Sequence, residues 1–201
     1  MSHNGRKKRV GVLALQGDFE AHRRALERAG AETLEVRSAG DLQGVEGLII
    51  PGGESTTMLK LIEQEKLLDP LREFGHRRPI LGTCAGAILL AAHVVGPPQA
   101  PVDSPPQASL GLMDIDVQRN AYGRQLDSRI AHLSPEGMEG GLEAVFIRAP
   151  IIRRVGKGAK VLATYGDDPV LVEQGLHMAA TFHPELTADS RVHLMFLGKI
   201  P

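Results

Sequence analysis

The first half of the chain alternates between apolar runs of strand length and stretches with apolar residues at helical spacing. Val10–Leu15 is a continuous apolar run of the kind found in buried parallel strands, and Asp18–Arg28 follows it with helical periodicity. The alternation continues, with strands expected at Thr33–Val36, Gly47–Ile50 and Pro79–Leu81 and helices at Thr56–Gln64 and Ala87–His93. This pattern predicts an α/β fold with a mostly parallel central sheet.

The second half has shorter apolar runs that are bounded more closely by turn residues, so antiparallel additions to the sheet are expected there. The expected strands are Asp114–Val117, Ala144–Ile147, Lys160–Thr164, Val170–Glu173 and His177–Ala180. A last helix is predicted at Ser190–Leu197. Five prolines between Gly96 and Gln107 indicate an irregular surface loop rather than a linker between domains.

The composition fits one domain with a substantial core. The chain has 201 residues, of which 42% are hydrophobic and 23% charged. We expect residues 10–201 to form this single domain. Residues 1–9 end in Arg6, Lys7, Lys8 and Arg9, and we expect them to form a basic, disordered tail rather than a nucleic-acid contact.

Charge and cysteine content exclude several classes of function. A net charge of −1 gives no electrostatic reason to expect a nucleic-acid or membrane partner. The single cysteine forms no internal disulfide and cannot build a cysteine zinc site, and no apolar run has the length of a signal peptide or membrane span. A reducing cytoplasm is therefore the expected location.

That cysteine, Cys84, is the first candidate for chemistry. It lies in Gly82-Thr83-Cys84-Ala85-Gly86, between an apolar strand and a small apolar helix, which is the pattern of a tight elbow that projects a nucleophile from a strand end. A helix beginning at Ala85 would place unsatisfied N–H groups beside the sulfur and favour the thiolate.

A candidate base and its orienting carboxylate occur together in His183-Pro184-Glu185. In an extended segment, residues two apart point the same way, so Glu185 can reach the His183 ring. Cys84, His183 and Glu185 form a candidate catalytic triad. Each signal alone is weak, because a buried cysteine is most often an inert small hydrophobe and such a tripeptide can be a simple turn.

A third element is the strand Leu48–Ile50, which leads into Pro51-Gly52-Gly53-Glu54 and a helix that we expect Ser55 or Thr56 to cap. Paired glycines allow backbone N–H groups to face a ligand, as an oxyanion hole requires. A phosphate site is the alternative, but the loop lacks both the P-loop ending and the dinucleotide pattern. An oxyanion hole fits better beside a cysteine.

These elements, in this order, resemble the class I glutamine amidotransferases, and more narrowly the glutaminase subunits of pyridoxal 5′-phosphate synthases. The resemblance runs from about Val10 to Leu197. It rests on the segments Val12–Gly17, Pro51–Thr57, Gly82–Gly86, Gly111–Asp114, Arg119–Gln125, Phe146–Pro150 and Phe182–Glu185. The basic N-terminal extension and the long proline-rich loop depart from the family pattern without interrupting these segments.

The resemblance implies a flavodoxin-like three-layer sandwich. It also implies hydrolysis of L-glutamine to glutamate and ammonia, with Cys84 as nucleophile, His183 as base and Glu185 as the residue that orients it. It also implies substrate contacts by the residues Gly53, Glu54, Ser55, Arg119, Ile147 and Arg148. From spacing alone, Arg119 and Arg148 would instead be assigned to surface or structural ion pairs. Arginine nevertheless suits a substrate that carries a carboxylate.

The implied partner is a (β/α)₈-barrel subunit that receives the ammonia in a hetero-oligomer, and neither a cofactor nor a metal is expected in this chain. The other histidines show no metal-ligand spacing with acidic residues and are interpreted as surface or packing residues: His3, His22, His76, His93, His132, His177 and His193. Two rivals remain, namely the glutaminase of another pathway, such as imidazole glycerol phosphate synthase, and a non-catalytic module on the same fold.

Overall fold

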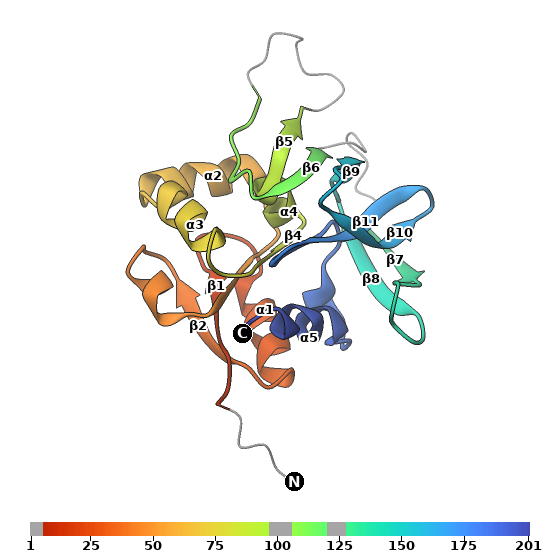
Figure 1. Cartoon of the computed structure of the whole chain (residues 1–201), viewed down its shortest axis with the longest axis horizontal. Helices are drawn as coiled ribbons and strands as arrows, with labels where there is room; N and C mark the ends of the chain where they lie inside the picture. The colour runs from red at the N-terminus through yellow and green to blue at the C-terminus, as the bar shows by residue number, and fades with distance from the viewer. Residues whose placement is uncertain (1–5, 97–105, 120–127) are drawn as a thin grey trace.

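The central element of the fold is a seven-stranded sheet with the order β10-β11-β12-β4-β3-β1-β2 (Figure 1). The computed structural model describes residues 6–96, 106–119 and 128–201. The strands of the sheet are β1 (Arg9–Leu13), β2 (Glu32–Val36), β3 (Gly47–Ile50), β4 (Ile80–Thr83), β10 (Lys160–Tyr165), β11 (Asp168–Gln174) and β12 (His177–Ala180). All pairings from β12 to β2 are parallel, and β11 and β10 extend one edge antiparallel. The predicted fold class is confirmed.

Helices cover both faces of this sheet. They are α1 (Phe19–Arg28), α2 (Ser55–Gln64), α3 (Leu68–Gly75), α4 (Ala85–Leu90) and α5 (Arg191–Gly198). Figure 1 shows α2 and α3 on one side of the sheet and α1 and α5 on the other. Successive side chains of β3 point to opposite faces of the sheet, and each face has its own hydrophobic core. Leu48 and Ile50 pack in one core with Met58 of α2, and Ile49 packs in the other with Phe196 of α5. Among the helices described, none is both long and apolar enough to cross a membrane.

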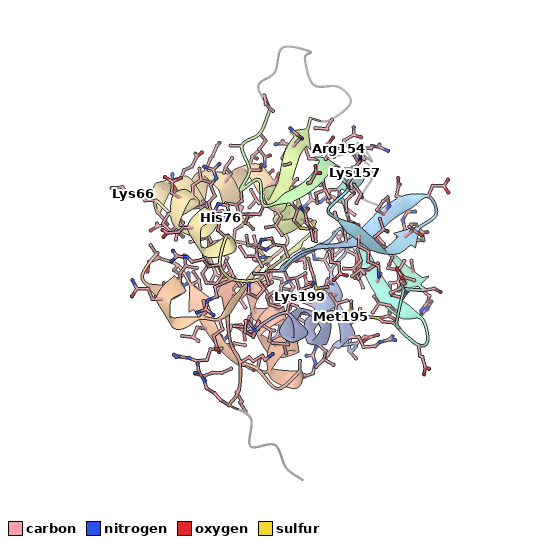
Figure 2. All side chains as sticks on the ribbon, viewed as in Figure 1. Lys66, His76, Arg154, Lys157, Met195 and Lys199 are labelled. Atoms are coloured by element: carbon pink, nitrogen blue, oxygen red, sulfur yellow. The ribbon has the colours of Figure 1, made fainter. Side chains whose placement is uncertain are left out.

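Two smaller sheets complete the fold. One contains β5 (Ala91–Val95), β6 (Met113–Gln118) and β9 (Ile151–Val155), and the other pairs β7 (Ser128–Leu133) with β8 (Leu142–Ile147). Charged side chains cover the outside of the molecule, as Lys66 and Lys157 illustrate in Figure 2.

Some predicted boundaries are wrong. The helix expected at 87–93 ends at Leu90, because Ala91–Val95 pairs with β6 and tertiary pairing overrides the helix propensity of its alanines. Helix α3 was not predicted, and Pro70 lies in its first turn, where proline is tolerated. The proline-rich loop lies outside the described residues from 97 to 105, as do residues 120–127 of the predicted Arg119–Gln125 motif.

The prediction that residues 1–9 form a disordered tail is wrong for Lys8 and Arg9. Arg9 opens β1, and the Lys8 ammonium donates hydrogen bonds to the carbonyl oxygens of Leu197 and Ile200 at 2.8 and 2.6 Å. A basic residue beside the last carbonyls of a helix satisfies acceptors that the helix cannot satisfy itself. Residues 1–5 lie outside the described residues.

The elbow between β4 and α4 consists of Cys84 alone, with φ 49° and ψ −106°. Positive φ is uncommon in residues other than glycine, so the surrounding packing must hold this conformation. A Cβ added at Gly82 would lie 2.5 Å from the backbone of Gly86, and one added at Gly86 would lie 2.0 Å from the Ile50 carbonyl oxygen. Both glycines are therefore required for β4, α4 and β3 to pack this closely.

Substitution of Gly86 by alanine tests this packing. Because the added methyl group meets backbone atoms, which cannot rotate away, we expect Gly86→Ala to lower the free energy of unfolding by about 1–3 kcal/mol or more. Urea denaturation measures the loss. Gly198→Ala is the control, because a Cβ there meets nothing within 4 Å, and it should leave stability unchanged or slightly higher. Equal stability of the two variants would contradict the packing argument.

Candidate active site

Three neighbouring strands deliver the candidate residues to one edge of the sheet. β12, β4 and β3 are adjacent and parallel, so their carboxyl ends lie together. β3 leads into Gly52 and Gly53, β4 ends at Cys84, and the chain after β12 reaches His183. The parallel order of the strands thus brings together three segments that lie far apart in the sequence.

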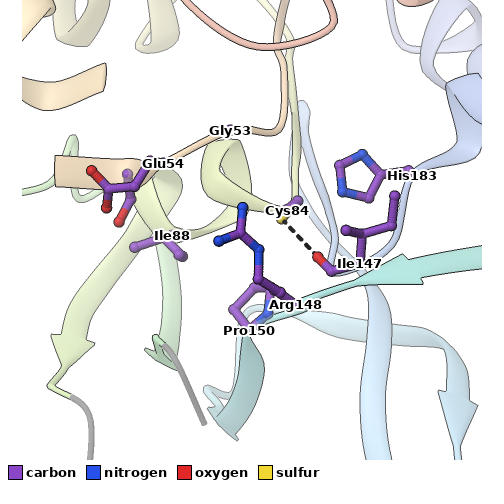
Figure 3. A pocket seen from close by; sticks show the side chains of 9 residues that line it. Gly53, Glu54, Cys84, Ile88, Ile147, Arg148, Pro150 and His183 are labelled. Atoms are coloured by element: carbon purple, nitrogen blue, oxygen red, sulfur yellow. Dashed lines mark hydrogen bonds between the residues drawn. The ribbon is translucent and has the colours of Figure 1, made fainter. Parts of the chain in front are cut away.

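A pocket of about 140 Å³ opens at this edge (Figure 3). It is lined by Gly53, Glu54, Ser55, Cys84, Ile88, Ile147, Arg148, Pro150 and His183. Seven of these residues were singled out from the sequence, whereas Ile88 and Pro150 were not. Two predicted residues, Glu185 and Arg119, do not line the pocket and reach it only through neighbours, Glu185 through His183 and Arg119 through Gln107.

Cys84 occupies the centre of the pocket, and its side chain lies between the Arg148 guanidinium and the His183 ring in the view of Figure 3. The residue is 6% exposed, and its Sγ lies 4.0 Å from the Ile147 carbonyl oxygen. A buried thiol that opens onto a pocket beside a titratable ring has the surroundings of a reactive cysteine rather than of an inert core residue.

His183 and Glu185 are joined by a hydrogen bond of 2.7 Å between Nδ1 and Oε1. The predicted contact therefore exists, but Glu185 reaches the ring from a 3₁₀ turn, Pro184–Leu186, and not from extended chain. Burial alone would lower the pKa of His183, but hydrogen bonds and charge from Cys84 and Glu185 outweigh it and raise the pKa to about 10. The ring is thus held as an imidazolium at neutral pH.

The Gly52-Gly53 loop packs directly over Cys84 and His183. A Cβ added at Gly52 would lie 2.5 Å from Cε1 of His183 and 3.2 Å from Cβ of Cys84. Gly52 is therefore in contact with both candidate catalytic side chains, and any larger residue would displace the ring. Gly53 has φ 145°, which side-chain-bearing residues rarely adopt. The double glycine places backbone, rather than side chains, beside the sulfur.

Glu54, and not Ser55 or Thr56, caps helix α2. Its carboxylate accepts from the backbone N–H groups of Thr56 and Thr57 at 3.1 and 2.8 Å. Burial opposes its ionisation, but these bonds and those from the two threonine hydroxyls lower the pKa of Glu54 to about 2. The side chain thus fixes the start of α2, and with it the glycine loop that precedes the helix.

Gln16 and Gly17 also hold this loop, and sequence reasoning assigned them no role. The Gln16 amide, oriented so that both its atoms find complementary partners, donates to the Glu54 carbonyl at 3.0 Å and accepts from the Glu54 N–H at 3.1 Å. At Gly17, with φ 85°, a Cβ would lie 1.8 Å from the Gly52 carbonyl oxygen. The conspicuous Leu15-Gln16-Gly17 ending of the first apolar run was the available signal.

Arg119 reaches the site through an intermediary. Its guanidinium donates to Oε1 of Gln107, and the same oxygen accepts from the Ser55 hydroxyl at 3.1 Å. Arg148 lies in the pocket itself and has φ 45°, a second side-chain-bearing residue with positive φ beside Cys84. The two arginines therefore stand at different depths of the site, one in the pocket wall and one behind Ser55.

Two histidines interpreted as surface or packing residues lie directly behind the triad. His22 of α1 and His193 of α5 are both fully buried. Nε2 of His22 lies 3.2 Å from Oε2 of Glu185, and Nδ1 of His22 lies 3.1 Å from Nε2 of His193. The packing interpretation is therefore incomplete. Within residues 6–96, 106–119 and 128–201, no group of three or more His, Cys, Asp or Glu side chains is arranged to hold a metal ion.

Comparison with known proteins agrees with this geometry. The chain is 58% identical to the pyridoxal 5′-phosphate synthase subunit PdxT of Solibacter usitatus, over 96% of this chain and 100% of the relative. It is 55% identical to the protein of the same name from Deinococcus radiodurans, over 94% of this chain and 95% of the relative.

Solved structures lead to the same family. A structure described as a glutamine amidotransferase superposes with a TM-score of 0.86 at 48% identity, covering 95% of this chain and 98% of the other. The PurLQS structure from Thermotoga maritima shares the fold, with a TM-score of 0.70 at 18% identity and coverage of 98% and 100%. Residues 12–200 match the SNO glutamine amidotransferase family, and the resemblance predicted from the sequence is confirmed: the chain belongs to this family.

Proposed function

We propose that this chain hydrolyses the side-chain amide of L-glutamine to glutamate and ammonia, and that it does so as the glutaminase subunit of a pyridoxal 5′-phosphate synthase. The main observation that supports this chemistry is that Cys84 and His183 line one pocket and that Glu185 is hydrogen-bonded to Nδ1 of the His183 ring. A nucleophile, a proton carrier and an orienting carboxylate are the groups that amide hydrolysis through a covalent intermediate requires.

The first half of the reaction uses the imidazolium form of His183. The Cys84 sulfur, as thiolate, attacks the side-chain amide carbon of glutamine and forms a carbon–sulfur bond. The amide oxygen becomes an oxyanion until the carbon–nitrogen bond breaks. His183 gives its proton to the departing nitrogen, which leaves as ammonia, and a thioester remains on Cys84.

The second half uses the neutral ring that this step leaves behind. His183 takes a proton from water, whose oxygen attacks the thioester carbon, and the carbon–sulfur bond breaks to release glutamate and the thiolate. His183 then holds the proton again, as at the start. Glu185 stays ionised throughout, because its pKa is kept below the usual range by His22 and His183 despite its burial.

Backbone N–H groups would stabilise the oxyanion. Those of Gly53 and Ala85 are the candidates, because Gly53 lines the same pocket as Cys84 and Ala85 follows Cys84 at the start of α4. Because Gly52 lies so close to the His183 ring, a shift of the glycine loop would also shift the ring.

The remaining lining residues suit a substrate with its own charged end. We propose that Arg148 holds the α-carboxylate of glutamine, with Gly53, Glu54, Ser55 and Ile147 forming the walls of the site. Arg119 would contribute through Gln107 and Ser55, as the hydrogen bonds of the free protein indicate.

The partner is inferred from the relatives. Those at 55–58% identity are named as subunits of pyridoxal 5′-phosphate synthase, which supports delivery of ammonia to a synthase subunit over the imidazole glycerol phosphate alternative and over a non-catalytic module. We propose that this subunit is a (β/α)₈ barrel and that it, rather than this chain, builds the cofactor.

Labelling tests the nucleophile. Because Cys84 is the sole cysteine, an electrophilic glutamine analogue should modify the protein once. Cys84→Ala should abolish both the labelling, seen by mass spectrometry, and glutamate release. Glutamate release by the alanine variant at more than a trace of the wild-type rate would rule out the triad.

The His183 interaction predicts a difference in thiol reactivity. An unassisted thiol is only about 3% ionised at pH 7, so His183→Ala should slow alkylation of Cys84 by about tenfold or more near pH 6.5. Because the pKa of His183 is raised to about 10, its charge should persist throughout the neutral range, whereas the rate difference should shrink as the pH approaches about 8.5, where an unassisted thiol ionises by itself.

Turnover measurements on variants of His183 and Glu185 separate the roles of these two residues. His183→Ala should reduce kcat by roughly 10³-fold or more and Glu185→Gln by less, since the second change leaves base and nucleophile in place. Steady-state glutamate release measures both. Normal alkylation and turnover in His183→Ala would show that the histidine only packs against the cysteine.

Ammonia delivery is tested with the complete synthase. With the barrel subunit and its phosphosugar substrates present, Cys84→Ala should fail to support pyridoxal phosphate formation from glutamine but should support it fully from ammonium salts. Absorbance of the product reports both reactions. If the variant also blocked the ammonium-driven reaction, the chain would have a role in synthesis other than supplying ammonia.

A further inference from the structure

A chain of buried polar side chains continues from the triad into the interior of the protein. His22 and His193 lie on two different helices, are 171 positions apart in the sequence and have no exposed surface. Nε2 of His22 lies 3.0 Å from the Thr83 hydroxyl and 3.2 Å from Oε2 of Glu185. Glu185 therefore has one oxygen directed at His183 and the other at His22.

The contacts determine where the protons lie. If His22 carried its proton on Nδ1, its bare Nε2 would face the Glu185 carboxylate, and two acceptors would lie 3.2 Å apart. His193 would then carry its proton on Nδ1, a fully buried atom with no hydrogen-bond partner. The opposite tautomers remove the first problem and reduce the second. His193 Nε2–H then donates to His22, His22 Nε2–H faces Glu185 and Thr83, and His193 Nδ1 is left as a bare acceptor instead of an unpaired N–H donor.

Both rings are neutral in this arrangement. Burial lowers the pKa of His193 to about 3, and burial and the nearby His183 charge lower the pKa of His22 against the opposing effect of Glu185. His22 therefore acts on Glu185 as an N–H donor and adds no second positive charge to the site. Oε2 of Glu185 is buried and makes no hydrogen bond that meets the angular criteria, so the His22 Nε2–H, 3.2 Å away, is the group placed to offset its desolvation.

From these contacts we infer that His22 is a positioning residue for the glutaminase reaction: its Nε2–H holds Glu185 in the orientation that serves His183, and His193 fixes the His22 tautomer that makes this possible. The inference rests on the proposed function. His22 also contacts Thr83, the residue before the nucleophile, and so it connects the segment that carries the base with the segment that carries the thiol.

Paired substitutions at His22 test the donor. His22→Leu should lower kcat by about tenfold to a hundredfold and change KM by less than about threefold, since the lost contact orients Glu185 and touches no substrate. His22→Gln, whose amide nitrogen can occupy the Nε2 position, should retain most of kcat, whereas His22→Asn, whose shorter amide cannot reach Glu185, should behave like the leucine variant. His193→Leu should cause a smaller loss.

A matched control separates positioning from stability. His177 is also buried, but it lies at the amino end of β12, where its Nδ1 is 3.3 Å from the Ile80 N–H, away from the pocket. His177→Leu should lower the melting temperature and leave kcat within about twofold. Unchanged kcat in His22→Leu, or equal loss in His22→Gln and His22→Asn, would overturn the inference. Should the leucine variant fail to fold, the glutamine and asparagine pair decides the question.

The tautomers are measured independently of catalysis. Imidazole ¹⁵N spectra of the histidine-labelled protein at pH 7 should show both rings neutral and protonated at Nε2, with His22→Gln and His193→Leu providing the assignments. A His22 ring protonated at Nδ1 would contradict the inference even if the triad is catalytic. If wild-type protein did not hydrolyse glutamine, alone or with its partner, the proposed function would fail while the tautomer result would still stand.

Discussion

The site depends on the side-by-side, parallel pairing of β3, β4 and β12. Each strand contributes one part at its carboxyl end, namely the glycine loop, Cys84 and the segment that carries His183. The contact of Gly86 with the Ile50 carbonyl oxygen shows how little space separates two of these parts. A strand spacing of about 5 Å thereby keeps these three segments close together at one edge of the sheet.

The sequence predicted the parts whose signals are local. Gly47–Ile50 and His177–Ala180 are apolar runs bounded by turn residues, and β3 and β12 begin and end at those residues. The Ala87–His93 helix was wrong at its end, because an apolar segment fits a helix and a strand equally well until its pairing with β6 is known. Strand β7 was missed because its side chains are mostly exposed and carry no alternating pattern.

The same distinction applies to the site. Cys84, His183 and Glu185 were identified because their motifs are compact in the sequence. His22 and His193 were not, since each fits the apolar face of an ordinary helix and only the docking of α1 and α5 brings their rings together. Glu54 was assigned to substrate contact although its carboxylate caps α2, a role that depends on where the helix begins.

The chain of polar contacts behind Cys84 draws on both ends of the polypeptide. His22 belongs to α1 and His193 to α5, the first and last helices of the part of the chain that the structure describes, and Lys8 binds the carbonyl oxygens of Leu197 and Ile200. During synthesis, the elbow at Cys84 therefore leaves the ribosome long before His183, Glu185 and helix α5. Under the proposed function, a nascent or truncated chain that ends before these segments would carry the nucleophile without its base.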